Sequence, residues 1–147
     1  MSSFELTTGR LLYDALDLWV TVPPYRHFPC ETINYRLFPA VHFDKIIAFY
    51  DEFEDCKFLR GFVTYAFMTK REFHSRIYWG WEIFAREEDD EDSEMLVFVD
   101  MIAPGGKNDV LSMCRDVRRL FKEKYPHVKN VYAHRGPRNG VFPNKGG

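Results

Sequence analysis

Apolar residues near the N-terminus recur every three to four positions. Residues 7–19 place leucines, an alanine and a tryptophan at this spacing, which predicts an amphipathic helix that Thr7 or Thr8 could cap. The prolines at 23 and 24 require the helix to end before them. Residues 30–37 indicate a short second helix, which Pro39 is expected to end.

The middle of the chain changes to strand-like patterns. Two apolar stretches, residues 45–50 and 57–68, flank the acidic residues 51–55 and predict a β-hairpin. Residues 70–84 carry aromatic residues at roughly helical spacing, although Gly80 weakens a helix there. The tract EEDDEDSE at residues 87–94 is almost wholly acidic, which favours a solvated loop.

An apolar run at residues 95–102 contains a single charge, Asp100, and predicts a buried strand. A carboxylate in a buried strand is costly unless it is paired, hydrogen-bonded or used in chemistry. The strand stops at Pro104, Gly105 and Gly106, and a helix is expected from residue 109, capped by Asn108. Strand, glycine turn and helix together direct backbone N–H groups at an anion or an oxyanion.

The C-terminal third predicts a helix followed by two strands. Residues 109–124 form an amphipathic pattern with an apolar side (Val110, Leu111, Met113, Cys114, Val117, Leu120, Phe121) and a basic side (Arg115, Arg118, Arg119, Lys122, Lys124). Strands are expected at residues 128–134 and 141–145. The order of elements predicts an α+β domain with a mostly antiparallel central sheet flanked by helices.

Composition narrows the class of protein. The 147 residues suffice for one domain with a core, and 14 Phe, 8 Tyr and 3 Trp indicate a globular chain. No apolar run reaches membrane-spanning length, and no signal peptide is recognisable. Three scattered cysteines predict free, buried thiols in a reducing compartment, and so a cytoplasmic location, without a disulfide frame or a metal site.

Charge is distributed unevenly. Residues 1–103 hold ten basic and 19 acidic side chains, whereas residues 104–147 hold ten basic and three acidic ones. The basic part suits an anionic partner such as a phosphopantetheine phosphate, an acidic carrier protein or nucleic acid. Alternatively, it complements the acidic part of the same chain.

A stiff aromatic and basic loop, residues 23–29, separates the first two helices. Loops on a rigid scaffold often carry chemistry, and a histidine there suits general-base catalysis near neutral pH. His27 is therefore one candidate base. Taken alone, it is more typical of an ordinary surface histidine.

Two segments resemble a known family. FVDMIAPGG at residues 98–106 is similar to the (W/F)-I-D-W-I-A-P-F-G motif of the toxin-activating lysine acyltransferases, the hemolysin-activating RTX-type protein acyltransferases. In that family the aspartate is catalytic, which would make Asp100 catalytic here. The family's S-P-x-H-R-x-(W/F)-P segment carries a catalytic histidine, and Arg26, Phe28 and Pro29 align with it. This alignment puts Tyr25 at the catalytic position, unless the histidine is displaced to His27.

The resemblance extends roughly from residue 12 to residue 145 and implies an N-acetyltransferase-like (GNAT-like) fold. It implies transfer of an acyl group from the phosphopantetheine of an acyl-carrier protein, or from acyl-CoA, to a lysine of an acceptor protein. No permanently bound cofactor is implied. The thioester oxygen, or the phosphates of the carrier, would bind at Gly105, Gly106, Lys107 and Asn108. Arg135 would be a further binding residue.

A second hypothesis follows from the departure at Tyr25. A tyrosine with an ordinary pKa of about 10 is a poor base at neutral pH. The chain is then a catalytically degenerate acyltransferase-like protein that acts as a binding or structural component, in a homodimer or a larger assembly. Nucleic acid binding through residues 115–129 is the weakest of the three interpretations.

Overall fold

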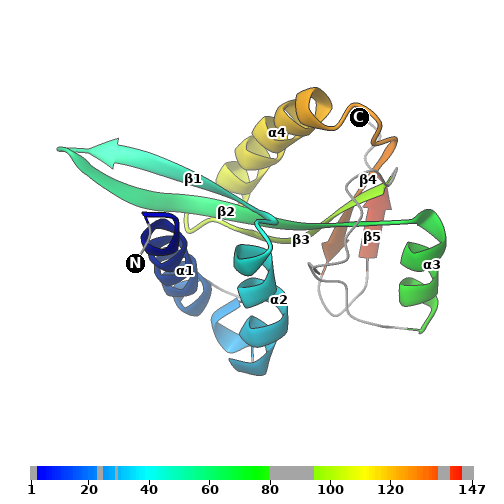
Figure 1. The fold of residues 1–147 in the computed structure, drawn as a ribbon, viewed down its shortest axis with the longest axis horizontal. Helices are drawn as coiled ribbons and strands as arrows, with labels where there is room; N and C mark the ends of the chain where they lie inside the picture. The colour runs from blue at the N-terminus through cyan, green and yellow to red at the C-terminus, as the bar shows by residue number, and fades with distance from the viewer. Residues whose placement is uncertain (1–2, 23–24, 29, 80–94, 136–139, 144–147) are drawn as a thin grey trace.

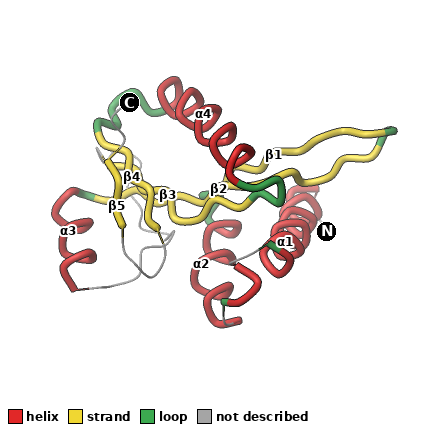
Figure 2. Tube along the Cα trace, turned by 180° about the vertical axis from the view of Figure 1, so that it is seen from behind, coloured by secondary structure: helices red, strands yellow, loops and turns green. Residues whose placement is uncertain are grey.

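The computed structural model describes residues 3–22, 25–28, 30–79, 95–135 and 140–143. A five-stranded sheet with the order β1-β2-β3-β4-β5 forms its centre (Figure 1). Helices α1 and α2 cover one face of this sheet, and α4 covers the other, as the view from behind also shows (Figure 2). The predicted α+β class with helices flanking a mostly antiparallel sheet is confirmed.

The N-terminal helices are longer than the sequence predicted. Helix α1 spans Ser3–Thr21, so Thr7 and Thr8 lie within it and not at its start. After the short 3-10 helix η1 (Tyr25–His27), α2 spans Cys30–His42 and contains Pro39. The expectation that Pro39 ends this helix is wrong. The lost N–H bond is tolerated because the last turn still packs, with Ala40 and Val41 buried in the core.

The predicted hairpin is confirmed. Strand β1 (Ile46–Phe53) pairs antiparallel with β2 (Cys56–Met68) through a turn shorter than the acidic stretch suggested. The turn places Glu54 at φ 49° and Asp55 at φ 64°. Left-handed values at two successive residues suit the right-handed twist of a hairpin, but they are unfavourable for Glu54, because glycine, asparagine and aspartate are the residues that adopt them readily.

Helix α3 spans Lys70–Trp79, and strand β3 spans Met95–Ile102, as predicted. The rest of the expected helix to residue 84 and the acidic tract lie outside the described residues. Helix α4 spans Lys107–Lys124 with Gly106 as its N-cap and without a side-chain cap. Asn108 is therefore not the cap, because the helix begins one residue before it.

Strand β4 (Asn130–Arg135) lies parallel to β3, and β5 (Gly140–Pro143) pairs antiparallel with β4. The single parallel pair arises because α4 carries the chain back across the sheet before β4 begins. Beneath α4, the residues Met113, Val117 and Phe121 are buried. Leu111 and Leu120 were expected on the same side, but they are 45% and 47% exposed.

Close packing at Gly61 joins β2 to the end of β3 and to α4. A Cβ at position 61 would lie 2.5 Å from the Met113 sulfur and 2.8 Å from the Ile102 carbonyl oxygen. A glycine is required there because any side chain would displace a strand or the helix. This contact holds the N-terminal half of α4 against the end of β3 and the turn that follows it.

Two other expectations concern the chain as a whole. Cys30 and Cys56 are exposed, and Cys114 is half-buried, so the prediction of buried thiols is wrong for the first two. They lie at the start of α2 and at the hairpin turn, which have one side open to solvent. Within the described residues, no helix has the length and apolarity that crossing a membrane requires.

Candidate functional site

Asp100 lies on β3 just after an irregularity in strand pairing. Tyr65 of β2 faces Phe98, but the next residue, Thr64, faces Asp100, so Val99 has no partner on β2. Such a bulge adds one residue to one strand and changes the face to which the following side chains point. Bulges recur beside functional sites, where they redirect a side chain.

The two hydrophobic clusters on the two faces of the sheet show which way the β3 side chains point before the bulge. Leu96 and Phe98 pack on the α4 side, and Val97 packs on the other side. With unbroken alternation, Asp100 would follow Phe98 toward α4. The bulge instead turns Asp100 to the face that α2 covers.

On that face, Asp100 is 1% exposed and forms an ion pair with Arg36 of α2. The guanidinium engages both carboxylate oxygens: Nη2 bonds Oδ1, and Nε donates to Oδ2 over 3.3 Å. Thr64 adds a third partner, because its hydroxyl donates to Oδ2 (3.4 Å) and accepts from the Asp100 backbone N–H (3.0 Å). An arginine that contacts both oxygens of a buried carboxylate pairs its charge and supplies hydrogen bonds that water would otherwise provide.

Tyr25, rather than His27, belongs to this centre. Burial raises the pKa of the Tyr25 phenol, and the negative charge of Asp100 raises it further. The Met101 backbone hydrogen bond and Arg36 act in the opposite direction with smaller effects. The ring is half-buried, but its hydroxyl lies beside the buried β3 backbone. The phenol therefore stays protonated at neutral pH and cannot serve as a base.

Aromatic rings enclose the centre on the side of α1. The Tyr25 ring contacts Trp19 edge-on at 5.0 Å and Phe28 at 5.4 Å between centroids. The Arg36 guanidinium lies 5.5 Å from the centroid of Phe28, a cation–π contact. Four pockets lined by described residues include none of Asp100, Arg36 and Tyr25.

His27, the other candidate base, is exposed at the end of η1. Its Nε2 accepts a hydrogen bond from Nε of the neighbouring Arg26 (3.2 Å). Asp100, in contrast, is buried between β2 and α2. The structure thus brings Tyr25 to Asp100 and leaves His27 at the surface.

The turn after β3 has the predicted strand–glycine–helix form. Gly106 has a left-handed φ of 83°, its N–H donates to the Ala103 carbonyl (3.2 Å), and α4 follows directly. Lys107 and Asn108 are exposed in the first turn of that helix. A Cβ at Gly105 would overlap the Asp109 carboxylate, which therefore lies against the turn. The chain itself supplies a negative charge where an anionic ligand was expected.

Two further sequence expectations can be placed only in part. Arg135 ends β4, and its side chain lies outside the described residues. Among the residues described here, no three histidine, cysteine or acidic side chains gather in an arrangement that could hold a metal ion.

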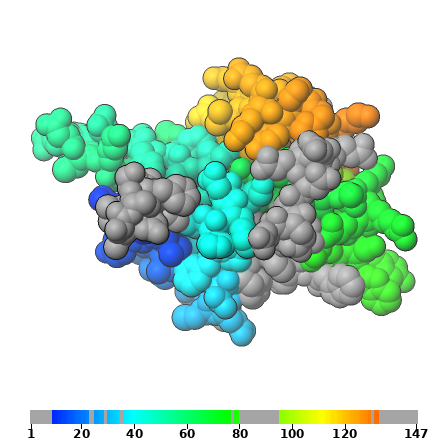
Figure 3. All heavy atoms as spheres, viewed as in Figure 1, coloured from blue at the N-terminus to red at the C-terminus, as the bar shows by residue number. Residues whose placement is uncertain are grey.

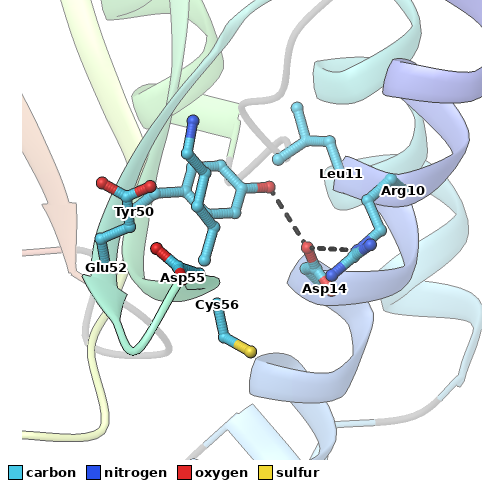
Figure 4. Close-up of a pocket in the computed structure, with 8 residues that line it drawn as sticks. Arg10, Leu11, Asp14, Tyr50, Glu52, Asp55 and Cys56 are labelled. Carbon is cyan, nitrogen blue, oxygen red and sulfur yellow. Dashed lines mark hydrogen bonds and ion pairs between the residues drawn. The ribbon is translucent and has the colours of Figure 1, made fainter.

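A second aspartate–arginine–tyrosine group, which no sequence pattern had indicated, joins α1 to β1. Oδ2 of Asp14 in α1 accepts a hydrogen bond from the Tyr50 hydroxyl of β1 (3.3 Å) and pairs with Arg10 Nε (3.4 Å). Burial and the Asp14 charge raise the pKa of Tyr50. These residues line an open pocket of about 740 Å³ between α1 and the hairpin (Figure 4). Only the pairing of distant segments could have revealed it.

No model of a known protein family matches the chain, and no curated protein matches it.

Proposed function

We propose that this chain is a catalytically degenerate, acyltransferase-like protein that acts as a binding component of a larger assembly. The observation that supports this proposal is the pairing of Asp100 with Arg36 and Thr64. An aspartate that assists a general base must offer its charge to that base. Here two other side chains already take up both carboxylate oxygens.

The neighbouring phenol supports the same conclusion. Tyr25 stands where the resemblance to the toxin-activating acyltransferases places a histidine. Because burial and Asp100 raise its pKa, Tyr25 holds its proton and cannot accept one from a lysine ammonium. The carboxylate of Asp109 at the Gly105 turn further disfavours a thioester oxyanion or a phosphate at that place.

A second candidate function is the acyl transfer that the resemblance implies, from acyl-carrier protein or acyl-CoA to a protein lysine. The specific observation in its favour is the position of Tyr25 beside Asp100. In that case the neutral phenol would donate a hydrogen bond to the thioester oxygen, and the lysine would have to arrive already deprotonated.

The two candidates are separated by incubating the full chain with acyl-CoA, or with loaded acyl-carrier protein, and measuring acyl adducts by mass spectrometry. We expect neither self-acylation nor transfer to an added lysine peptide. Wild type, Tyr25→Phe and Asp14→Asn should give the same background signal. Asp14→Asn is the matched control because it alters the second aspartate, which bonds Tyr50 and Arg10 and not the Asp100 group.

Acylation by wild type that Tyr25→Phe abolishes, with Asp14→Asn unaffected, would overturn the degenerate assignment and establish the acyltransferase. The circular dichroism spectrum of each variant shows that it is folded. This control matters because the centre is buried and a loss of activity could otherwise reflect unfolding.

A further inference from the structure

The β1–β2 hairpin extends away from the rest of the molecule. Its outer end lies beyond both α1 and α4 (Figure 1), and the space-filling view shows it as a narrow projection (Figure 3). Residues 51–58 form this hairpin tip, which carries four carboxylates and a single lysine. Residues 52–58 are exposed, so packing within the molecule does not account for the residues found at the hairpin tip.

Two exposed phenylalanines lie on one side of the hairpin tip. Phe53 is 67% exposed and Phe58 is 50% exposed. The register pairs Phe53 with Cys56 and Asp51 with Phe58, so the two rings are diagonal neighbours on one face of the ribbon. The turn between them holds Glu54 and Asp55 in left-handed conformations. Exposed aromatic residues next to an unfavourable turn are typical of a contact surface.

A groove of opposite charge lies at the other end of the sheet. It has a volume of about 530 Å³ and opens between the C-terminal half of α4 and strands β3 and β4. The basic groove is floored by buried rings of Phe98, Phe121 and Tyr125, and Arg118, Lys122 and Lys129 surround it as exposed cations.

We infer that the hairpin tip of one copy of this chain docks in the basic groove of a second copy. The inference rests on the proposed binding function and names its partner. Phenylalanine rings match the aromatic floor, and the four carboxylates of the tip match the three cations at the rim. Hairpin-to-hairpin contact would instead place like charges opposite each other.

A copy cannot fill its own groove. In both views the C-terminal end of α4 lies on the side of that helix away from the hairpin tip, and the two are well separated (Figures 1 and 2). The contact joins two different surfaces, so each bound copy still offers a free tip and a free groove. Association of this kind continues beyond a dimer, to a ring or an open chain.

Sedimentation velocity of the full chain over a range of concentrations tests the inference. Wild type should form species larger than a dimer, and raising salt from about 0.05 M to about 0.5 M should weaken them, because exposed charges are screened. The tip variant Glu52→Lys/Glu54→Lys and the groove variant Arg118→Glu/Lys122→Glu should each lower the association constant about tenfold or more.

Mixing the two variants provides the sharpest measurement. Each variant alone has tip and groove of the same sign, but in a mixture every tip meets a groove of opposite sign. The mixture should therefore regain association close to that of wild type. Lys70→Glu/Arg71→Glu on exposed positions of α3 is the matched control, and it should associate as wild type does.

Phe53→Ser/Phe58→Ser tests the apolar part of the contact and should also weaken association without changing the net charge. A wild type that stays monomeric throughout would overturn the inference, as would a mixture that fails to recover. If the chain is monomeric and also shows no acyl transfer, only this choice of partner fails. Acyl transfer by wild type would instead refute the proposed function.

The acidic residues 87–94 lie outside the described residues and are a competing occupant by charge alone. Replacing them with serine and glycine should leave the self-association intact. Loss of association in that variant, with the tip variant unaffected, would assign the groove to this tract and overturn the role of the hairpin.

Discussion

Two groups in this molecule contain the same three residue types in different surroundings. Asp100, Arg36 and Tyr25 meet in the core, where the side-chain exposure is 0% for the aspartate and 9% for the arginine. Asp14, Arg10 and Tyr50 meet at the rim of a pocket, where the corresponding values are 16% and 70%. In both groups burial and the aspartate raise the tyrosine pKa. Side-chain chemistry alone therefore does not distinguish a structural centre from a surface contact.

The two groups differ in what surrounds the charged side chains in place of water. In the core, the arginine and a threonine hydroxyl take over the hydrogen bonds of the Asp100 carboxylate. At the rim, solvent still shares the charge of Arg10. A buried pair is expensive to break because the remaining charge is stranded, whereas an exposed pair is screened and contributes little.

The largest effect is expected from Asp100→Asn. Losing the carboxylate strands the Arg36 charge in the core, so the free energy of unfolding should fall by about 3–5 kcal/mol. Urea denaturation measures it. Combining Asp100→Leu with Arg36→Met removes both charges and should recover much of the loss. A single variant with wild-type stability would show that the ion pair is not needed for folding.

Thr64→Val should have the next largest effect. The shape of the side chain is kept, but the hydroxyl that bonds the Asp100 carboxylate and its backbone N–H is lost. Leaving those buried groups partly unsatisfied should lower the free energy of unfolding by about 1–3 kcal/mol. The same urea titration checks this value, and an unchanged midpoint would mean that Arg36 alone satisfies Asp100.

Alkaline pH should separate the two tyrosines. The folded pKa of Tyr25 is raised, so its contribution to stability is complete below the unfolded pKa of about 10. Above that pH the unfolded phenol ionises and the folded one does not, which lowers stability by up to about 1.4 kcal/mol per pH unit. Tyr25→Phe should remove this part of the slope.

Tyr50→Phe is the matched control, and it should change the slope less because Tyr50 is 41% exposed. Unfolding free energies between about pH 8 and pH 11 provide the measurement. Equal slopes for wild type and Tyr25→Phe would contradict the assigned burial of the Tyr25 hydroxyl.

Asp14→Asn should have the smallest effect. The pair with Arg10 is exposed to solvent, so its loss should change the free energy of unfolding by about 0–1 kcal/mol. The difference should shrink further in high salt, because exposed charges are screened. A change as large as that of Asp100→Asn would remove the distinction between the two groups.

Much of the fold could be predicted from local patterns. The hairpin, strand β3 and helix α4 follow from apolar periodicity and from glycine and proline positions, which act over a few residues. Errors occurred at the ends of elements. Pro39 was expected to end α2, and Asn108 was expected to cap α4, but α2 continues to His42 and α4 begins at Lys107.

The sequence by itself determined that Asp100 lies in an apolar strand and must have a partner, because a lone buried charge is too costly. Only the tertiary structure decided which partner. The bulge at Val99 turns Asp100 from the α4 face to the α2 face. There it bonds Arg36, which is 64 residues away in sequence. Strand register and helix docking depend on contacts between distant segments, and such contacts cannot be predicted from local residue patterns.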